Sequence, residues 1–375
     1  MKIMFSIGTL SSGGAERVVC NLSNYLNKFH DIHIVSVKKT DIAYTLDSNI
    51  SIDFLDNREE ISYDKLMNKR ILDKIKRIIR NLRRVRKLKN IIKKNKPEII
   101  VSFLPEPNFL NLILKSKFKI PIIISIRNDP KEEYKSNLYN RLMKKYYPQA
   151  DAIVYQTEEA KNFFRNIIGN NVIQEIIPNP INEEFIERPY KGIRKKIIVT
   201  VGRLQEQKNH KLLIDAFEKV SNQIPDYKLV IYGDGNKKQE LETYIKSKNL
   251  LDKVMLAGNT KEVKKHIYDA SLFILSSDYE GMPNALMEAM ALGLPVISTD
   301  CPCGGPKFLI DNGKNGILVK VKDVEAMSKA ILKVLENKNY ADYLSMNASK
   351  IAETLNPTKI NNEWKKIIEK IGKNK

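Results

Sequence analysis

The chain has few of the residues that hold secreted or membrane-spanning proteins together. Its 375 residues include only three cysteines, Cys20, Cys301 and Cys303, which are too few for a disulfide framework. No apolar run approaches the ~18 residues expected of a membrane-spanning helix. The chain starts as a first strand rather than as a signal peptide, because its apolar run is short and leads into a glycine-rich loop. These absences favour a cytoplasmic protein that does not cross a membrane.

Common motifs for binding metals and phosphates are also missing. No Asp-x-Asp occurs, Cys301 and Cys303 lack two further ligands, and the four histidines are scattered (His30, His33, His210 and His266). The first glycine-rich loop is not a Walker A motif, because Gly14 and Ala15 stand where Lys and Ser or Thr are required. It also lacks G-x-G-x-x-G, which weakens a dinucleotide-binding interpretation. We therefore expect no bound metal.

Basic residues, by contrast, are abundant. The formal net charge is +20 at pH 7, which indicates an anionic partner such as a membrane surface or a nucleic acid. Residues 65–96 hold fifteen basic residues and a single acid, Asp73. Ile71, Ile75 and Ile78 begin an apolar stripe at helical spacing, so the segment is predicted to be a basic amphipathic helix.

The apolar stripe and the basic residues of this segment call for different explanations. Packing against a sheet would explain the apolar stripe, but not the many like charges, which repel each other at i,i+4 spacing. Anionic lipid headgroups would relieve that repulsion, whereas nucleic acid is disfavoured because the segment has no aromatic residue for base stacking. We therefore expect an anionic membrane surface and no nucleic acid. The cations expected to bind lipid headgroups or a lipid diphosphate are Arg77, Arg80, Arg83, Arg84 and Lys87.

Short apolar strands alternate with helical segments in two series along the chain. The first series is expected at 1–9, 32–37, 50–55, 98–103, 121–126 and 152–156, and the second at 196–201, 228–232, 254–257, 272–275, 296–299 and 317–321. This alternation predicts α/β architecture with mostly parallel sheets. Ile177-Pro178-Asn179-Pro180 is the candidate hinge. Domains are therefore predicted at 1–180 and 181–357, followed by an amphipathic helix over 358–375.

Residues 272–293 form the most informative stretch, in which a strand passes through a short loop into a helix. Gly281 lets the backbone approach a ligand closely, and Pro283 presets the first turn of a helix predicted from Asn284 to Leu292. The free N–H groups and the positive end of the helix dipole at such a start suit a phosphate.

Two carboxylates, Glu280 and Glu288, bracket that phosphate site. Carboxylates accept hydrogen bonds from sugar hydroxyls, so acids on either side of a phosphate site suit a nucleotide-sugar. Taken as isolated acids, they could instead be a loop residue and a solvated helix position. The surrounding string, SSDYEGMPNALMEAMALGLPVISTD, is more specific than the two acids. It resembles the donor-site signature of the family 4 retaining glycosyltransferases, which have the GT-B fold.

Two further strings support this resemblance. GRLQEQKN at 202–209 resembles the second signature of the family, and SGGAER at 12–17 resembles the first loop, near the donor phosphates. The resemblance implies two Rossmann-like domains that face each other across a cleft, with the C-terminal helix crossing back onto the first. The first domain would bind the acceptor and the second the nucleotide-sugar donor.

The resemblance also assigns roles to residues of the donor site. Arg203 and Lys208 would clamp the donor diphosphate, and Glu280 would position the donor sugar, so these three are the expected catalytic residues. The full expected donor site comprises Gly13, Gly14, Arg203, Lys208, Gly258, Asn259, Glu280, Gly281, Met282, Pro283, Asn284, Ala285, Leu286 and Glu288.

Two loops of the first domain are candidates for binding the acceptor. One contains Glu106, and the other contains Arg127, Asn128 and Asp129. Both follow predicted strands, and open α/β sheets bind ligands beyond the carboxyl ends of their strands. Arg127 can pair with a phosphate and Asp129 with sugar hydroxyls, or the two can pair with each other. Many relatives have a histidine in the second loop, so Arg127 marks a subgroup.

The resemblance implies an overall activity. It is the retaining transfer of a hexose or N-acetylhexosamine from a UDP-sugar to a polyprenyl-diphosphate-linked glycan, in the assembly of cell-surface polysaccharide. Such enzymes need no cofactor and no divalent metal, and this one would lie peripherally on the cytoplasmic face of the cell membrane. Two alternatives remain open. One is a non-transferring UDP-sugar enzyme of the same fold, such as an epimerase. The other is a basic membrane or nucleic-acid adaptor with a vestigial sugar site.

Overall fold

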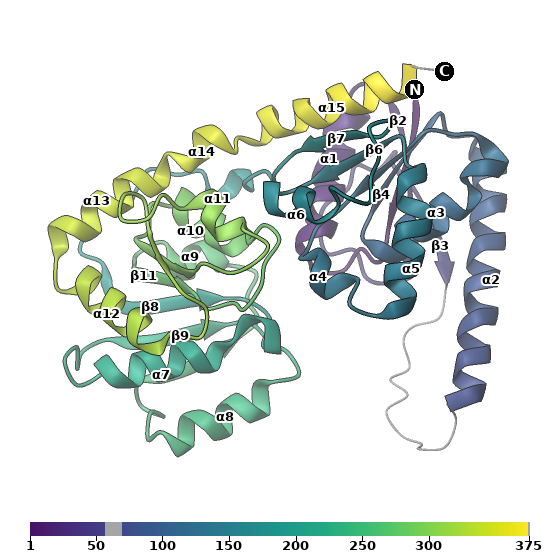
Figure 1. The fold of residues 1–375 in the computed structure, drawn as a ribbon. Coiled ribbons are helices and arrows are strands. Elements are labelled where there is room, and N and C mark those ends of the chain that lie inside the picture. Colours follow the sequence, from purple (N-terminus) through teal and green to yellow (C-terminus); the bar gives the residue numbers. More distant parts are fainter. Residues whose placement is uncertain (57–69, 374–375) are drawn as a thin grey trace. The chain divides into compact units, whose positions relative to one another are not determined.

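The computed structural model describes the backbone of residues 1–56 and 70–373, and the side chains of residues 1–56 and 79–373. The chain forms two compact units (Figure 1). Unit 1 comprises Met1–Ile177 together with Asn361–Lys375, and unit 2 comprises Pro178–Ile360. The domain limits expected from the sequence, at 180 and 357, lie close to these limits.

Unit 1 is built on a parallel sheet of seven strands in the order β3-β2-β1-β4-β5-β6-β7. The strands are β1 (Lys2–Ile7), β2 (Asp31–Lys38), β3 (Ser51–Asp56), β4 (Ile99–Phe103), β5 (Ile122–Ser125), β6 (Ala152–Tyr155) and β7 (Ile173–Ile176). The helices are α1 (Gly14–Asn27), α2 (Arg70–Asn95), α3 (Pro105–Phe118), α4 (Pro130–Glu133), α5 (Asn137–Tyr146), η1 (Tyr147–Gln149) and α6 (Glu158–Phe163). The central strands β4, β5 and β6 are buried along their whole length, as expected of a sheet covered on both faces.

Unit 2 is built on a second parallel sheet, of six strands in the order β10-β9-β8-β11-β12-β13. The strands are β8 (Lys195–Val201), β9 (Lys228–Tyr232), β10 (Val254–Gly258), β11 (Ala270–Leu275), β12 (Val296–Thr299) and β13 (Ile317–Val319). The helices are η2 (Glu183–Phe185), η3 (Glu206–Lys208), α7 (His210–Val220), α8 (Lys238–Ser247), α9 (Val263–Ile267), α10 (Asn284–Ala291), α11 (Gly305–Leu309), α12 (Val324–Leu335), α13 (Lys338–Ser349) and α14 (Ile351–Thr354). Two parallel sheets, one in each unit, confirm the predicted fold class.

In both sheets the strand order reverses at one place. The chain runs outward from β1 to β3 and then returns to β4 beside β1, and in unit 2 it returns from β10 to β11 beside β8. Loops that leave neighbouring strands at such a reversal diverge, which opens a crevice at the carboxyl ends of the strands. The loops singled out from the sequence follow these strands: 202–209 follows β8, and 276–283 follows β11.

The C-terminal helix α15 (Pro357–Lys373) contributes to unit 1 from Asn361 onward. Trp364 is fully buried, and its ring centre lies 5.5 Å from that of Phe103 at the end of β4. Tyr25 Oη donates to Asn362 Oδ1 at 2.7 Å, and His30 Nε2 lies 3.1 Å from Glu369 Oε1. The end of the chain is thus part of the core of unit 1.

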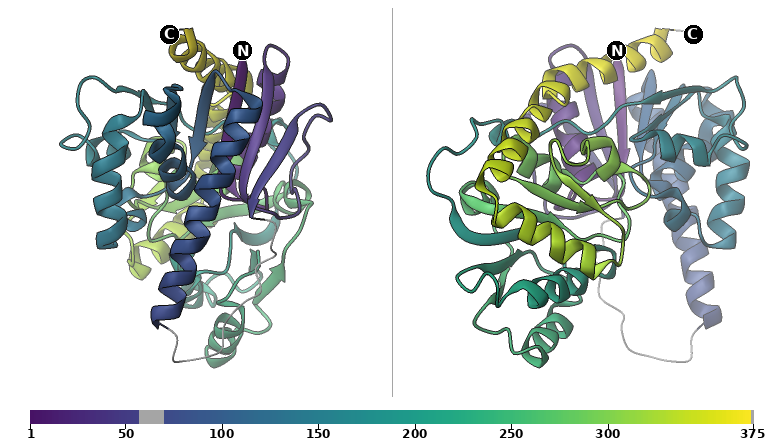
Figure 2. Two further views of the ribbon diagram at one scale, coloured as in Figure 1. Left: turned by 90° about the vertical axis from the view of Figure 1, so that its right-hand side faces the viewer. Right: turned by 60° about the vertical axis from the view of Figure 1, so that its left-hand side comes forward.

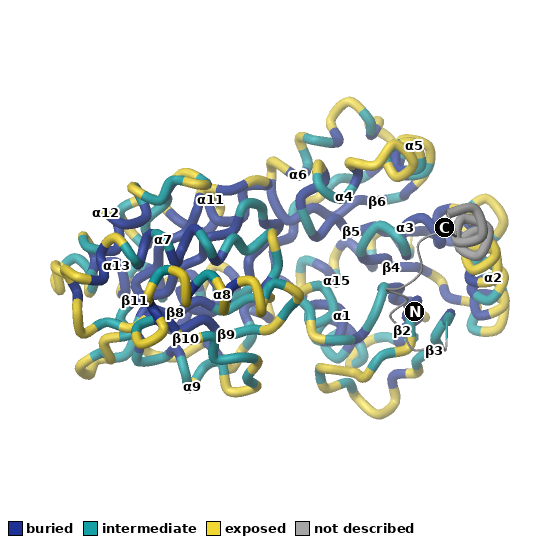
Figure 3. The backbone as a smooth tube through the Cα atoms, turned by 90° about the horizontal axis from the view of Figure 1, so that it is seen from below, coloured by how far each residue is buried: buried dark blue, intermediate teal, exposed yellow. Residues whose placement is uncertain are grey.

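The C-terminal half of helix α2 packs against the rest of unit 1. Leu88, Ile91 and Ile92 are buried, whereas Leu82 is 64% exposed. The N-terminal part of the helix extends past the sheet of unit 1 (Figures 1 and 2), and exposed stretches of the helix stand out against the buried strands (Figure 3). Of the basic segment predicted over 65–96, residues 65–69 and the side chain of Arg77 lie outside the described residues.

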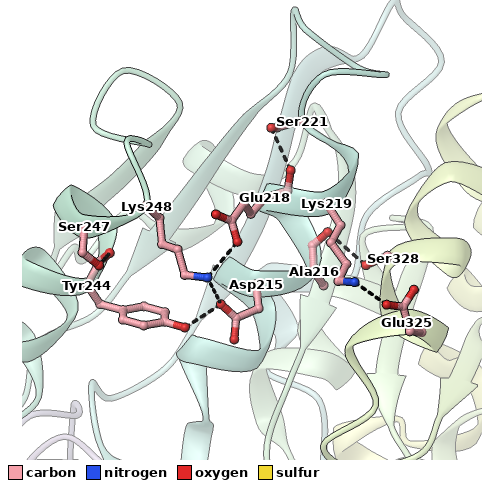
Figure 4. A network of polar contacts seen from close by, with 10 residues as sticks. All are labelled: Asp215, Ala216, Glu218, Lys219, Ser221, Tyr244, Ser247, Lys248, Glu325 and Ser328. Carbon is pink, nitrogen blue, oxygen red and sulfur yellow. Dashed lines mark hydrogen bonds and ion pairs between the residues drawn. The ribbon is translucent and has the colours of Figure 1, made fainter.

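Helix α7 begins where the 202–209 loop ends, and polar contacts hold it on two sides (Figure 4). Lys248, just after α8, bonds to Glu218 Oε2 at 2.8 Å and to Asp215 Oδ1 at 3.3 Å. On the other side, Ser328 of α12 donates its hydroxyl to the carbonyl of Ala216 at 3.1 Å. These contacts hold α7 in place, and α7 begins at His210, directly after the 202–209 loop.

The sequence did not predict the two helices α13 and α14, which follow α12 and precede α15. Both helices pack against α10. In the part of the chain that the structure describes, none of the helices is both long and apolar enough to cross a membrane.

Candidate active site

The site in unit 2 begins where the chain leaves β11. Leu275 is the last residue of the strand, and Ser276 and Ser277 follow it in fully buried positions. The carbonyl of Ser277 has left the sheet, and it accepts a hydrogen bond of 2.5 Å from the hydroxyl of Thr299, the last residue of β12. A buried carbonyl needs such a partner, so this bond sets the direction in which the loop leaves the sheet.

Glu280 is held through both its side chain and its backbone. Its Oε1 atom lies 2.5 Å from Lys208 Nζ and accepts a hydrogen bond of 2.7 Å from Ser277 Oγ. Its N–H donates to the carbonyl of Pro302 at 2.6 Å, and its own carbonyl accepts from the N–H of Cys303 at 2.8 Å. The residue is only 6% exposed. A charge-assisted pair of this kind is short and strong.

Four hydrogen bonds join the loop that follows β8 to the loop that follows β11. Gln207 donates its side-chain amide to the carbonyl of Tyr279 at 2.8 Å, and its own carbonyl accepts from the N–H of Asp278 at 2.8 Å. Ser276 donates to the carbonyl of Lys208 at 2.9 Å, and Asn209 donates to Asp278 Oδ1 at 2.9 Å. Lys208 and Glu280, which are 72 residues apart in sequence, are therefore held in a fixed relation.

Two glycines permit close backbone contacts around these loops. A Cβ atom on Gly233 would lie 1.9 Å from the carbonyl oxygen of Gly202, and the φ angle of +145° also favours glycine there. A Cβ atom on Gly305 would lie 1.9 Å from the carbonyl oxygen of Gly281. The turn into α10 and the start of the 202–209 loop therefore each pack directly against a neighbouring backbone.

Helix α10 starts at Asn284, with Pro283 at its N-cap position. The first N–H groups of a helix have no partner within it, and the helix dipole adds a partial positive charge there. Asn284 Oδ1 accepts a hydrogen bond of 2.9 Å from Asn179, which lies in the predicted hinge. Glu288 lies one turn further along and is 6% exposed. It is therefore a buried residue, not the solvated helix position that the sequence left open.

Arg203 and His210 stand at the two ends of the same loop. The side chain of Arg203 is exposed, and it forms no ion pair with the described residues. His210 Nε2 lies 3.4 Å from the carbonyl of Arg203, and burial lowers the pKa of His210 to about 4. A neutral imidazole thus supports the backbone at Arg203, while the guanidinium remains open to solvent and to an anion.

The remaining residues of the expected donor site fall in different places. Gly258 ends β10 at a φ of +73° and accepts a hydrogen bond of 2.8 Å from the N–H of Gly233, so it adjoins the same group of loops. Asn259 is exposed beside it. Gly13 and Gly14 lie in unit 1, where Gly13 caps α1 and its carbonyl accepts from Tyr44 Oη at 3.1 Å.

The candidate acceptor loop of unit 1 is shaped by aromatic packing. The guanidinium carbon of Arg127 lies 4.9 Å from the ring centre of Phe103 and 5.2 Å from that of Trp364. Burial lowers the pKa of Arg127 to about 9. Asp129 caps α4 by accepting from the N–H of Lys131 at 2.9 Å, and burial raises its pKa. Asn128, between them, is half-buried.

Glu106 and Arg84, which the sequence placed in different sites, are partners of each other. Arg84 Nη1 lies 2.5 Å from Glu106 Oε1, and Nη2 lies 3.4 Å from Asp56 Oδ2. Arg84 is only 4% exposed, so it differs from Arg80 and Arg83, which are exposed as expected of headgroup-binding cations. The prediction that groups Arg84 with them did not anticipate this buried bridge between α2, α3 and β3.

Sequence reasoning did not single out Ser277, Thr299 or Glu133. Ser277 and Thr299 were visible only as polar residues at the ends of strands, although that position is itself a signal in a parallel sheet. Glu133 lies in α4, and burial, followed by the charge of Asp129, raises its pKa to about 8. Ser277 bonds to Glu280, and Thr299 bonds to Ser277. Glu133 lies in the helix that directly follows the second candidate loop.

Comparison with known proteins matches both units to family models. The model described as Glycosyltransferase Family 4 matches residues 12–185, and the model described as Glycosyl transferases group 1 matches residues 182–351. An uncharacterised glycosyltransferase of Methanocaldococcus jannaschii is 30% identical over 341 residues, which are 77% of this chain and 83% of the relative. The chain belongs to the glycosyltransferases of family 4 and group 1.

Two relatives of this glycosyltransferase, both from Campylobacter jejuni, have named activities. One is described as an α-1,4-N-acetyl-D-galactosaminyltransferase of a GalNAc-containing diNAcBac-PP-undecaprenol; it is 29% identical, and the match covers 99% of each chain. The other is described as an N-acetylgalactosamine-N,N'-diacetylbacillosaminyl-diphospho-undecaprenol 4-α-N-acetylgalactosaminyltransferase. It is 30% identical, and the match covers 90% of each chain.

Solved structures share the fold of the glycosyltransferase at low sequence identity. Sucrose-phosphate synthase from Thermosynechococcus elongatus has a TM-score of 0.82 at 18% identity, and the match covers 99% of this chain and 98% of that one. HepE from Anabaena, in complex with UDP, has a TM-score of 0.80 at 16% identity, covering 99% and 100%. These matches establish the GT-B fold.

Proposed function

We propose that this glycosyltransferase moves a hexose or N-acetylhexosamine from a UDP-sugar to a lipid-diphosphate-linked glycan, with retention of configuration and without a divalent metal. The fixed pair of Lys208 and Glu280 at the strand reversal of unit 2 carries this proposal. The printed activities of the Campylobacter relatives support the lipid-diphosphate acceptor and the N-acetylhexosamine. The UDP bound in the HepE structure supports the nucleotide.

Three positive groups would take up the charge of the departing diphosphate. They are the guanidinium of Arg203, the ammonium of Lys208 and the N-terminus of α10 with the amides of Asn284 and Ala285. An ammonium group has three N–H donors, so Lys208 can hold Glu280 and a phosphate oxygen together. Positive charge placed in advance where negative charge develops is usually the largest single contribution to catalysis. In the proposed reaction these groups take the place of a divalent cation.

The transfer itself would proceed by substitution on the front face of the sugar. The bond between the anomeric carbon and the diphosphate oxygen breaks, and a bond from that carbon to the acceptor hydroxyl oxygen forms on the same face. The acceptor proton passes to the departing diphosphate oxygen. Glu280 orients the donor sugar by accepting hydrogen bonds from its hydroxyls. Glu288, buried in α10, would meet the ribose.

The acceptor would be received by unit 1. Asn128 and Asp129 follow the carboxyl end of β5, where ligands bind in sheets of this type. Arg127, packed against the rings of Phe103 and Trp364, supplies a positive charge for a phosphate of the acceptor. Glu106 is engaged by Arg84, so its role in binding the acceptor would be to order the loop that follows β4.

The acceptor also suggests where the enzyme works. We place it peripherally on the cytoplasmic face of the cell membrane, with α2 against anionic headgroups. Arg80 and Arg83 are exposed on this helix, and Leu82 between them is 64% exposed. Exposed basic residues beside an exposed apolar one are typical of helices that lie on a membrane surface, and each basic side chain there contributes about 1 kcal/mol.

Transfer can be tested with purified protein, a panel of UDP-sugars and a lipid-diphosphate-linked glycan. We expect transfer from at least one UDP-sugar, with the anomeric configuration retained in the product when it is analysed by NMR. Glu280→Ala and Arg203→Ala should each lower kcat/KM at least 100-fold, because each removes a charge contact in the transition state. Arg188→Ala, which changes an exposed arginine of unit 2 outside the site, is the matched control.

Several outcomes would count against transfer. If the unmutated protein converted a UDP-sugar without any acceptor, the non-transferring alternative would be favoured. If it neither bound nor converted any UDP-sugar, the adaptor with a vestigial site would remain. Transfer that continued undiminished in both Glu280→Ala and Arg203→Ala would place the chemistry elsewhere.

The membrane proposal has its own test, sedimentation with lipid vesicles. The protein should bind vesicles that contain phosphatidylglycerol and not vesicles of phosphatidylcholine alone. Reversing two exposed charges, Arg80→Glu with Arg83→Glu, should weaken binding at least tenfold. The control reverses two exposed charges of α8 in unit 2, Lys238→Glu with Lys246→Glu. Equal effects of the two double variants would mean that net charge, rather than α2, governs binding.

A further inference from the structure

Ser277 contacts Glu280 but has no role in the reaction proposed above. Its side chain is fully buried directly after β11, and its hydroxyl donates to Glu280 Oε1 at 2.7 Å. The same oxygen meets the ammonium of Lys208 at 2.5 Å. Two donors of different kinds, one neutral and one charged, therefore converge on a single oxygen of the carboxylate.

Thr299 supports Ser277 from the neighbouring strand. Leu275 of β11 pairs with Ser298 of β12, so Thr299 stands beside the point where the chain leaves the sheet. Its hydroxyl donates to the carbonyl of Ser277 at 2.5 Å, and both residues have no exposed surface. Thr299 thus holds the backbone of Ser277, and the side chain of Ser277 in turn holds the carboxylate of Glu280.

We propose that Ser277 and Thr299 are positioning residues of the transfer reaction. They hold Glu280 through its Oε1 atom, so that Oε2 is presented to the donor sugar. This inference rests on the proposed function, because it takes Glu280 as the residue that orients the sugar.

The two donors on Oε1 differ in how they respond to the substrate. A diphosphate attracts the ammonium of Lys208, which can then move or share its hydrogen bonds. The hydroxyl of Ser277 is neutral, and its backbone is anchored by Thr299, so the diphosphate does not draw it away. Ser277 therefore keeps the carboxylate in place while Lys208 engages the phosphates. A carboxylate held by Lys208 alone would follow the lysine, and the sugar would lose its orientation, which is costly for catalysis.

A purely structural role for the two hydroxyls predicts a different outcome. Buried hydroxyls that only satisfy neighbouring polar groups affect stability when they are removed. The molecules that remain folded would then bind donor and turn over normally. Ligands that differ only in the sugar separate the two cases, because UDP engages the diphosphate site, and a UDP-sugar engages Glu280 as well.

The experiment compares Ser277→Ala and Thr299→Val with the unmutated enzyme. Ser328→Ala is the matched control, because Ser328 is a buried serine of unit 2 whose hydroxyl bonds to the carbonyls of Ala216 and Val324 and not to Glu280 or its partners (Figure 4). Binding of UDP and of the active UDP-sugar is measured by calorimetry, and kcat and KM are measured for transfer. Thr299→Val is nearly isosteric, so it keeps the test informative if Ser277→Ala folds poorly.

We expect Ser277→Ala to bind UDP within about twofold of the unmutated enzyme, but to lose about 10- to 100-fold in kcat/KM and most of the added affinity due to the sugar. Thr299→Val should show the same pattern at about 3- to 10-fold, because it acts through Ser277. Ser277→Thr, which keeps the hydroxyl, should recover most of the activity. Ser328→Ala should keep the kinetic constants of the unmutated enzyme.

Two results would overturn the inference. One is that Ser277→Ala and Thr299→Val turn over like Ser328→Ala. The other is that UDP and UDP-sugar lose affinity equally, since that would mean a general collapse of the loop. Failure of the proposed function is read separately from the unmutated protein, which would then transfer no sugar from any UDP-sugar to the acceptor.

Discussion

The two units share a sheet architecture but place their charged groups differently. In unit 2, Lys208 and Glu280 come from the loops that follow the two strands at the reversal, and hydrogen bonds between those loops hold the pair. In unit 1, Arg84 is buried between Glu106 and Asp56, which lie on other elements. Arg127 is likewise held by residues outside its own loop.

This difference shows two ways to build a site on one architecture. The pair in unit 2 depends mainly on two short stretches that bond to each other, with further hydrogen bonds from Thr299, Pro302 and Cys303. The charges in unit 1 depend on α2, α3, β3 and α15, all brought together by packing. Unit 1 should therefore be sensitive to residues far from its candidate site, whereas the site of unit 2 should respond chiefly to changes in its two loops and in the residues that bond to them.

The largest expected effect is that of Trp364→Ala on unit 1. The ring is fully buried against Phe103 and Arg127, and removing such a ring costs about 3–5 kcal/mol of unfolding free energy. Hydrogen exchange should show faster exchange in β4 and α15, with β8 and β11 of unit 2 unchanged. Trp364→Phe should have a smaller effect, because the indole N–H has no partner among the described residues. Equal loss of protection in both units would contradict the comparison.

The second prediction concerns acid and unit 2. Burial lowers the pKa of His210 to about 4 from 6.5, so the unfolded chain takes up the proton first as the pH falls. The stability that depends on the neutral ring is complete above pH 6.5 and is lost towards pH 4, by up to about 3 kcal/mol. His210→Gln can still donate to the carbonyl of Arg203 but does not titrate.

Urea unfolding of unmutated protein and His210→Gln at pH 7 and at pH 4.5 measures this contribution. We expect the variant to lose less stability than the unmutated protein between the two pH values. Parallel losses in the two proteins would show that other groups dominate the response of unit 2 to acid.

The third prediction has the opposite sign and concerns unit 1. Burial, with the charge of Asp129, raises the pKa of Glu133 to about 8. A group whose pKa is raised on folding contributes stability that is complete below about pH 4.5 and is lost as the pH rises to about 8. Glu133→Gln should therefore gain roughly 3 kcal/mol relative to unmutated protein between pH 5 and pH 8. Urea unfolding at these two pH values tests it, with Glu132→Gln, the neighbouring acid of α4, as the control. A gain of the same size in both variants would assign the effect to net charge.

The smallest expected effect is at the junction of the two loops in unit 2. Asn209 caps α7 by accepting from the N–H of Leu212, donates to Asp278, and has a positive φ of 42°. Asn209→Ala should cost about 1–2 kcal/mol of unfolding free energy, and Asn209→Gly should cost less, because glycine accepts this backbone conformation. Thermal unfolding of both variants measures the difference. If alanine were tolerated as well as glycine, the loop would not depend on this conformation.

The sequence predicted the local backbone geometry of the candidate site in unit 2 better than that in unit 1, for a physical reason. Strand, loop and helix follow each other without interruption over 272–293, and the helix start at Asn284 was placed correctly. Local residues such as Gly281 and Pro283 determine that geometry. The pairing of Arg84 with Glu106 and Asp56 spans 22 and 28 residues, and no local pattern encodes it. The sequence therefore did not show that one of the basic residues of α2, Arg84, is buried.

The roles of Ser277 and Trp364 were beyond the sequence for the same reason. A serine after a strand is polar and small in any protein, and only the neighbouring strand β12 supplies the Thr299 hydroxyl that anchors it. The C-terminal helix was predicted from its apolar spacing, but its contact with Arg127 requires β4, β5 and α15 to be folded together.

By itself, the sequence determined the α/β class, the alternation of strands and helices and the loops that carry Arg203, Lys208 and Glu280, because periodicity and turn residues act over a few positions. Tertiary structure decided which of these charges meet one another. A parallel sheet brings the ends of distant strands to one edge, so partners such as Lys208 and Glu280, or Arg127 and Trp364, become neighbours only when the sheet has formed.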